Sequence, residues 1–457
     1  MSAVPDPIRL VSRVRPYLGD GSSLLIILQA ATSILRLGSN LILTRLLVPE
    51  AFGVVAIVVS IWYVLVMLSD LGLRAYVTRH PTASDELVQT VWTIRFIRNI
   101  FLATIMFVGA DFFANIYSAP EVSPAIRMAS AFILIEGLTS LGFLTNERAR
   151  RVIRLTLIDF VKFLFATTVT IIAAYFLRNF WAIIISMFVS SVFTLVVSYT
   201  LVKGPPIRFR LDREHVLDLW RFCRFVIPAS MISIVLTQTD KFFLAKFFPL
   251  AELGKYMLAS ALAMTILTVI GEYVMRVFYP RFAQVVREAP EKAADVFYAS
   301  RRQVTLLLAF GAGGVIGGAE LIIRILFNDN YLGAGFYLAI LCLQPLARLS
   351  SVPAEQALVA MGFIRITLVA NILRLAWVLG AAPIAYFQIG PLAVIVVMSL
   401  TEVVLLPFFW WHLHRRGLLK VSEELFIFGV AAVGYLIGFG GNWAVHAAIN
   451  AGLIPAF

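Results

Sequence analysis

Four polar side chains recur within one long apolar segment near the start of the chain. They are Gln29, Thr32, Arg36 and Asn40. Their spacings of three, four and four residues place them on one face of a helix. Arg36 stands near the middle of the segment, and its planar guanidinium could hold a phosphate through two parallel hydrogen bonds. The alternative is a structural pair between Arg36 and a carboxylate or carbonyl group of a neighbouring helix.

A second polar stripe lies 201 residues further along the chain, position by position. It consists of Ser230, Ser233, Thr237 and Lys241. Two equivalent helices with polar faces are what the walls of a water-filled cavity require, because polar groups are costly against lipid. Two cations in these stripes, Arg36 and Lys241, favour an anionic ligand.

Other charged residues interrupt apolar segments elsewhere. Arg95 and Arg98 lie one helical turn apart, and they could add to a basic cavity or equally reach the lipid headgroups. Asp159 and Lys162 have the spacing of a local pair, while Asp159 or Glu402 could titrate in proton coupling. The predicted substrate-cavity residues are Gln29, Arg36, Asn40, Arg95, Arg98, Lys162, Thr237, Lys241 and Arg374.

Two acid–base pairs occupy corresponding places in the two halves of the chain. Asp70 precedes Arg74 by four residues, and Glu272 precedes Arg276 by the same spacing. Such pairs support their own helix by a few tenths of a kcal/mol. They could instead exchange partners between the halves and close a gate. These four residues, together with Asp159, are the predicted gate or coupling residues.

The elements that position these residues are membrane helices. Of the 457 residues, 60% are hydrophobic and 14% are charged, and the mean hydropathy is +0.90. A bilayer core of about 30 Å needs about 20 apolar residues per helix, and continuous apolar runs exclude a barrel. The chain is therefore predicted to be an all-α, multi-pass membrane protein of about 13 helices. The predicted spans are residues 22–47, 51–77, 88–113, 124–146, 153–177, 179–202, 221–248, 253–279, 301–327, 332–361, 364–387, 389–412 and 424–446.

Basic residues gather in alternate connections between these spans. Arg9, Arg13, Arg148, Arg208 and Arg416 all fall on one side. Short loops rich in Lys and Arg remain in the cytoplasm, so the N-terminus is predicted to be cytoplasmic. The same distribution explains the net charge of +12 without any nucleic-acid partner.

The two halves of the chain align with each other. Residues 39–55, SNLILTRLLVPEAFGVV, match 240–256, DKFFLAKFFPLAELGKY, without a gap. Arg45 then falls on Lys246, and such charged matches carry weight because charges are rare here. The predicted organisation is an N-terminal segment (1–21), an N-lobe (22–202), a basic cytoplasmic linker (203–220), a C-lobe (221–412) and an additional C-terminal helix (413–457).

Several motifs carry a family resemblance. The ILTRLLVPEAFG block (42–53), the SDLGL segment (69–73), the NERARR loop (146–151) and the basic linker resemble the polysaccharide transporter family. These are the Wzx-type flippases of the multidrug/oligosaccharidyl-lipid/polysaccharide exporter superfamily. The resemblance implies a 12-helix core of two six-helix lobes around a central cavity, working by alternating access. It also implies a polyprenyl-pyrophosphate-linked oligosaccharide as cargo and the bacterial cytoplasmic membrane as location.

The expected partners are an anionic lipid-linked oligosaccharide and membrane lipids, and they could include polysaccharide polymerase and co-polymerase proteins. No metal or cofactor is expected, and coupling to H⁺ or Na⁺ stays undetermined. The alternative function is a secondary exporter of drugs or small metabolites. A membrane-embedded polymerase or ligase would need a large extracytoplasmic loop, and the connections are short. The glycine-rich FGAGGVIGGAE (310–320) is interpreted as a helix-packing segment, not a nucleotide loop.

Overall fold

The structure is a computed structural model that describes residues 21–451 except 70, 81–83, 149–150 and 203. These residues fold into two compact units. Unit 1 consists of the chain up to Leu47 together with Ile61–Ser230, and unit 2 consists of Val48–Ser60 and the chain from Met231 onward. Both units are helical, and strands do not occur in the described ranges. The all-α membrane class predicted from the sequence is confirmed.

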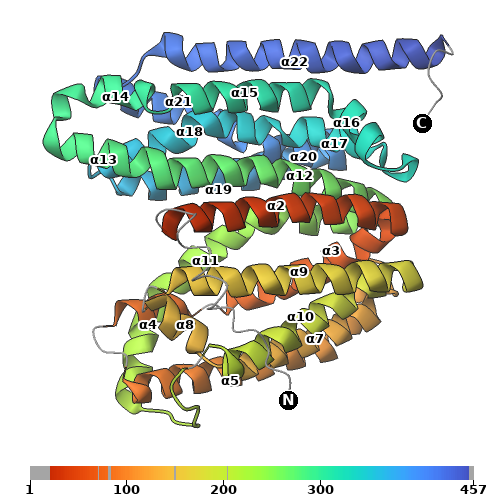
Figure 1. The fold of residues 1–457 in the computed structure, drawn as a ribbon, viewed down its shortest axis with the longest axis vertical. Coiled ribbons are helices and arrows are strands. Elements are labelled where there is room, and N and C mark those ends of the chain that lie inside the picture. Colours follow the sequence, from red (N-terminus) through yellow and green to blue (C-terminus); the bar gives the residue numbers. More distant parts are fainter. Residues whose placement is uncertain (1–20, 70, 81–83, 149–150, 203, 452–457) are drawn as a thin grey trace. The chain divides into compact units, whose positions relative to one another are not determined.

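Unit 1 is built from the helices of the first half of the chain (Figure 1). They are α2 (Gly21–Leu46), α4 (Leu73–Arg79), α5 (Asp85–Val108), α6 (Ala110–Ile116), α7 (Val122–Leu138), α8 (Gly142–Arg148), α9 (Val152–Leu177) and α10 (Trp181–Thr200). Two helices, α3 (Pro49–Leu68) and α11 (Arg213–Phe247), each contribute residues to both units. The unit boundary within α11 therefore lies beyond the predicted linker, 203–220.

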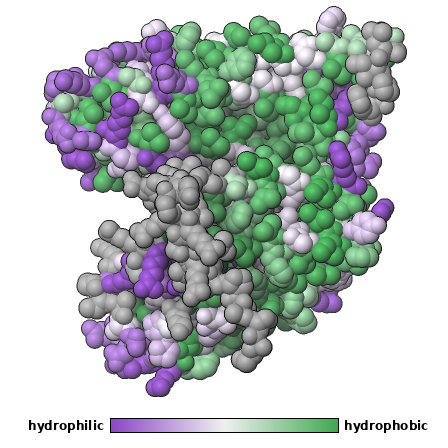
Figure 2. Space-filling view, viewed as in Figure 1, coloured by the Kyte–Doolittle hydropathy of each residue, from purple (hydrophilic) through white to green (hydrophobic). Residues whose placement is uncertain are grey.

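Unit 2 holds the remaining helices. They are α12 (Leu250–Tyr273), a π-helical turn (Val274–Phe278), α13 (Tyr279–Glu288), α14 (Ala293–Ala299), α15 (Arg302–Gly317), α16 (Ala319–Leu326), α17 (Ala334–Leu341), α18 (Leu343–Ala360), α19 (Arg365–Ile389), α20 (Pro391–Ser399), α21 (Thr401–His414) and α22 (Val421–Asn450). Figure 2 shows hydrophobic residues along these helices and hydrophilic residues gathered near α13 and α14.

Within the described residues, nine helices are long and apolar enough to cross a membrane, or eleven if each of two bent pairs counts as one span. The bent pairs join α7 to α8 at 54° and the segment Pro290–Gly317 to α16 at 77°. The remaining predicted spans, 22–47 and 221–248, coincide with α2 and α11. Every predicted span thus corresponds to a helix or a broken helix in the structure.

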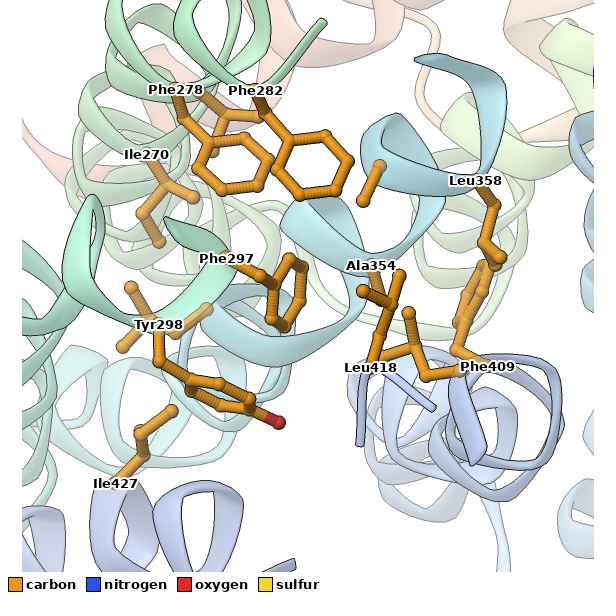
Figure 3. Packing of buried hydrophobic residues seen from close by; sticks show 14 of the residues in the cluster. Ile270, Phe278, Phe282, Phe297, Tyr298, Ala354, Leu358, Phe409, Leu418 and Ile427 are labelled. Carbon is orange, nitrogen blue, oxygen red and sulfur yellow. The ribbon is translucent and has the colours of Figure 1, made fainter. Parts of the chain in front are cut away.

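The core of unit 2 is aromatic (Figure 3). The rings of Phe278 and Phe282 stack with their centroids 5.5 Å apart, and Phe297 meets both of them edge-on. Leu358 of α18 and Phe409 of α21 complete this fully buried cluster. Large buried rings contribute the most apolar area per residue. This cluster therefore stabilises the part of unit 2 that contains α13 and α14.

The last helix, α22, packs backbone to backbone against α15 (Figure 1). A Cβ atom added to Gly313 would lie 1.9 Å from the carbonyl oxygen of Ala431, and one added to Gly438 would lie 2.3 Å from that of Gly314. Only glycine permits this approach. The interpretation of 310–320 as a packing segment is confirmed.

Candidate functional site

A cavity of about 650 Å³ lies inside unit 1. Its walls come from α3, α4, α5, α7, α8, α9 and α10, together with the segment between α7 and α8. This volume falls within the range of sites that enclose small molecules. The cavity is therefore the candidate functional site of this unit.

Three cations from the predicted set of substrate-cavity residues line this cavity. Arg95 and Arg98 come from α5, and Lys162 comes from α9. Helix α5 begins cleanly, because Ser84 caps it by accepting a hydrogen bond from the Leu87 amide at 3.2 Å. With that start fixed, the two arginines reach the cavity from adjacent turns of the helix.

The two arginines have different surroundings. Arg95 donates to the carbonyl and hydroxyl oxygens of Thr139, where α7 breaks before α8. Arg98 donates to the side-chain oxygen of Asn99 at 3.0 Å and to the carbonyl of Ser69 at 3.4 Å. Thus Arg95 braces the broken helix as well as lining the cavity, which makes it in part a positioning residue.

The break between α7 and α8 shapes one wall of the cavity. The Thr139 carbonyl also accepts a hydrogen bond from Trp92 at 3.1 Å, and the Ser140 hydroxyl donates to the Ser198 carbonyl at 2.7 Å. Gly142 starts α8 so close to the segment that follows α10 that an added Cβ would lie 2.1 Å from the Val202 carbonyl oxygen. Irregular backbone inside a membrane protein is tolerated where it is buried or lines a cavity, and both conditions hold here.

Lys162 and Asp159 form the local ion pair that their spacing predicts. The two charged groups are 3.1 Å apart on α9, and Asp159 is the more exposed partner. Lys162 lines the cavity, whereas Asp159 is not among the described lining residues. The pair therefore supplies the cavity with a cation, Lys162, whose charge is partly neutralised by Asp159.

The cavity also holds residues that the sequence reading missed. Trp62, Glu136 and Glu147 line it, as do four hydroxyl side chains of α10. Those four are Ser186, Ser190, Ser191 and Thr194. The acids carried a detectable signal, because carboxylates are rare in apolar segments. The hydroxyl spacing of four residues between 186, 190 and 194 was a second signal.

Arg36 lies on α2, and its predicted role in a cavity shared by the two halves stays a prediction. Its side chain is exposed, and its guanidinium carbon lies 5.7 Å from the ring centre of Phe163 on α9. Asn40 is half-buried, and the side chain of Gln29 lies outside the described part of the chain. None of these residues is among the described residues that line the cavity.

The predicted cavity residues of the second half lie in unit 2. Lys241 donates to the side-chain oxygen of Gln238 at 3.3 Å, and Thr237 is exposed. Arg374 is buried between two carboxylates, 3.1 Å from Glu402 and 3.2 Å from Glu355. Unit 2 therefore surrounds Arg374 with counter-charges.

Glu402 stands at the centre of this charge network. Its carboxylate also accepts from Arg348 at 3.2 Å and from the Ser351 hydroxyl at 2.8 Å. The two arginines and two glutamates balance in charge, which is the condition under which buried ions are tolerated.

The predicted gate residues are described in part. Glu272 and Arg276 form an ion pair within their own helical segment, and about half of each side chain is exposed. Asp70 lies outside the described residues, as does the side chain of Arg74. Exchange of partners between the halves stays a prediction.

A second buried ion pair, also missed by the sequence reading, anchors α22. The Arg301 guanidinium meets the Glu424 carboxylate, and both side chains are almost completely buried. Tyr298 and Ser350 donate further hydrogen bonds to the same carboxylate, at 3.1 and 2.6 Å. Clusters of His, Cys, Asp and Glu suited to a metal ion do not occur in the described part of either unit.

Comparison with solved structures identifies the fold. Lipid II flippase MurJ, in an inward closed conformation, superposes with a TM-score of 0.67 at 13% identity, covering 91% of this chain and 97% of MurJ. An inward-facing multidrug resistance MATE family transporter of the MOP superfamily gives a TM-score of 0.58, also at 13% identity, covering 91% of this chain and 96% of that one.

Comparison of sequences identifies the family. The succinoglycan biosynthesis transport protein ExoT of Rhizobium meliloti (strain 1021) is 24% identical over 302 residues, which span 66% of this chain and 61% of ExoT. The family described as polysaccharide biosynthesis protein matches residues 42–335. The resemblance read from the sequence motifs is confirmed. This multi-pass membrane protein therefore belongs to the polysaccharide biosynthesis protein family.

Proposed function

We propose that this chain moves a polyprenyl-pyrophosphate-linked oligosaccharide across the bacterial cytoplasmic membrane by alternating access. The cargo would be a repeat unit of a surface polysaccharide, such as exopolysaccharide, O-antigen or capsule. The N-terminus would lie in the cytoplasm. Membership of the family, similarity to a succinoglycan transport protein and a fold shared with a lipid II flippase support this proposal.

One observation carries the choice of cargo: a cavity inside unit 1 collects Arg95, Arg98 and Lys162. A pyrophosphate that leaves water for the membrane loses strong hydration, and only cations and hydrogen-bond donors can replace it. The polyprenyl chain needs no such replacement and can stay in the lipid. Glu136 and Glu147 also line the cavity, so its three cations exceed its acids by one charge, and this excess favours an anionic cargo over a cationic drug.

The test is the distribution of lipid-linked repeat units between the two leaflets. Deletion of the gene should leave these intermediates on the cytoplasmic leaflet, where an added periplasmic glycosidase cannot reach them. Complementation with Arg98→Gln should restore export poorly, because the cavity loses a cation. Arg287→Gln removes an exposed arginine of α13 and serves as the control that should restore export fully.

An unchanged leaflet distribution in the deletion strain would contradict the proposal. Export by Arg98→Gln equal to that of the control would contradict the role of the cavity but not that of the protein. Both measurements need expression levels matched by quantitative blotting.

A further inference from the structure

Two helix ends of unit 2, those of α18 and α21, are followed by turns of the same kind. A glycine with positive φ follows each helix, Gly362 at +92° and Gly417 at +66°. The residue after each glycine, Phe363 or Leu418, donates its amide hydrogen to a carbonyl five positions earlier, at 3.0 Å in both turns. This hydrogen bond defines a Schellman motif, which fixes the backbone at a helix end. The side chains that these turns carry therefore start from well-defined positions.

Two neighbouring arginines at these turns lie over aromatic rings. The guanidinium carbon of Arg416 lies 3.7 Å from the ring centre of Phe363, and that of Arg415 lies 4.0 Å from the ring centre of Trp411. Arg416 also donates to the His412 carbonyl at 2.9 Å. A guanidinium over a ring keeps further N–H donors in its own plane, and it is ordered before any ligand binds. The two arginines therefore form a preorganised group of donors.

These cations have no acidic partner in the described part of the chain. Neither Arg415 nor Arg416 forms an ion pair with a described carboxylate, and the same is true of the exposed Arg365 at the start of α19. In contrast, Arg301 and Arg374 of the same unit are each paired with a buried glutamate. The charge of the first three arginines is therefore available to an anion from outside the protein.

The surroundings of the arginines combine apolar and hydrophilic surface. Ile364 is 71% exposed, Trp411 49% and Phe363 41%. The adjacent Lys420 forms an ion pair with Asp295 of α14 at 2.9 Å, and hydrophilic residues gather near α14 in Figure 2. Exposed aromatic and apolar side chains beside arginines are typical of the membrane–water interface. A dissolved anion gains nothing from the apolar groups, whereas a lipid offers a phosphate to the arginines and carbon chains to their neighbours.

We propose that Arg415 and Arg416 bind the phosphate group of an anionic phospholipid such as phosphatidylglycerol. The exposed parts of Phe363, Ile364 and Trp411 pack against the glycerol backbone and the first carbons of the acyl chains. This lipid site lies within unit 2, whereas the candidate cavity lies in unit 1. The inference is therefore independent of the proposed cargo.

The test measures lipid binding to the full-length protein after delipidation in detergent micelles. Native mass spectrometry gives the affinity for the first bound dioleoyl phosphatidylglycerol and for dioleoyl phosphatidylcholine, which has the same acyl chains. Inorganic phosphate and farnesyl pyrophosphate are added as competitors. Size-exclusion chromatography verifies that each variant is folded.

The variants separate a built site from general attraction by charge. Arg416→Lys keeps the charge but loses the planar fork and the contact with the ring. Phe363→Leu keeps an apolar side chain but removes the ring. The matched control is Arg287→Lys, the same exchange at an exposed arginine of α13.

The expected result is selective for one lipid and one position. The unsubstituted chain should bind phosphatidylglycerol more tightly than phosphatidylcholine, because the choline cation is repelled by the arginines. Arg416→Lys should weaken phosphatidylglycerol binding about tenfold, the effect of one lost hydrogen bond to a charged group. Phe363→Leu should weaken it as well, and Arg287→Lys should leave it unchanged.

Four results would overturn the lipid site. Equal phosphatidylglycerol binding by Arg416→Lys and the unsubstituted chain would show attraction by charge alone, and equal binding of the two lipids would remove the preference for an anion. Displacement by inorganic phosphate at similar concentrations would assign the arginines to a soluble anion. Tighter binding of farnesyl pyrophosphate, also lost in Arg416→Lys, would assign them to the cargo. The leaflet distribution of repeat units tests the proposed function separately from all four.

Discussion

The glycine contact between α15 and α22 permits a quantitative test. In Gly313→Ala, the new methyl carbon would start 1.9 Å from the Ala431 carbonyl oxygen. Real Cβ atoms essentially never come closer than 3.0 Å to such an atom, so the two helices must separate by the difference, 3.0 − 1.9 = 1.1 Å. A gap of 0.5 to 1 Å already loses about a quarter to a half of each dispersion contact. We expect Gly313→Ala to destabilise unit 2 by about 1–3 kcal/mol, the usual cost of overpacking.

A matched control lies two residues away on the same helix. Gly311 is exposed, and a Cβ there would meet nothing within 4 Å. Gly311→Ala should therefore leave stability unchanged or raise it by up to about 1 kcal/mol, because alanine favours the helix. The substitution Gly313→Ala gains the same helix preference, so the difference between the two variants isolates the cost of the contact.

The assay is reversible unfolding of the purified chain in mixed detergent micelles at increasing fractions of dodecyl sulfate. Tryptophan fluorescence reports the folded fraction, and the transition midpoint is compared between the variants. Size-exclusion chromatography at low dodecyl sulfate verifies that each variant starts folded. Equal midpoints for Gly313→Ala and Gly311→Ala would refute the backbone contact between α15 and α22.

Two further predictions follow from buried polar contacts. Glu424→Gln should destabilise unit 2 by about 3–5 kcal/mol in the same assay, because Arg301 keeps a buried charge without its partner. The adjacent Glu423→Gln should cost less than about 1 kcal/mol, since Glu423 forms a longer and more exposed ion pair, 3.7 Å from Arg302. Equal costs for the two variants would contradict the burial of the pair of Arg301 and Glu424. Thr93→Val should speed amide hydrogen exchange in the linker segment 207–212, because the Thr93 hydroxyl accepts a hydrogen bond of 3.1 Å from the Arg210 backbone amide. Mass spectrometry measures this exchange. An unchanged exchange rate would show that this hydrogen bond does not hold the linker.

The sequence predicted the helices and several charged groups well, because both depend on local patterns. Apolar length and the cost of unpaired backbone in lipid locate each span. The i, i+3 spacing likewise predicts the pair of Asp159 and Lys162, which the structure contains. The glycine segment at 310–320 was also informative, because glycine clusters in apolar helices have few uses besides close packing.

Contacts between distant segments could not be predicted in the same way. Arg301 and Glu424 are separated by 123 positions, and their pairing depends on which faces of α15 and α22 meet. The prediction for Arg36 depends on the same kind of contact: its side chain is exposed beside Phe163, and its role in a cavity shared by the two halves stays a prediction. Periodicity places residues on a face of a helix, but only tertiary packing decides what that face contacts.

The attachment of α22 has a consequence for how this family can vary. A homologue that ends before this helix would leave the guanidinium of residue 301 without its carboxylate partner. It would also expose the glycine backbone at residues 313 and 317. Shorter homologues should consequently carry an uncharged residue in place of Arg301 and bulkier side chains in place of the two glycines. We therefore expect the three substitutions to accompany the absence of the helix.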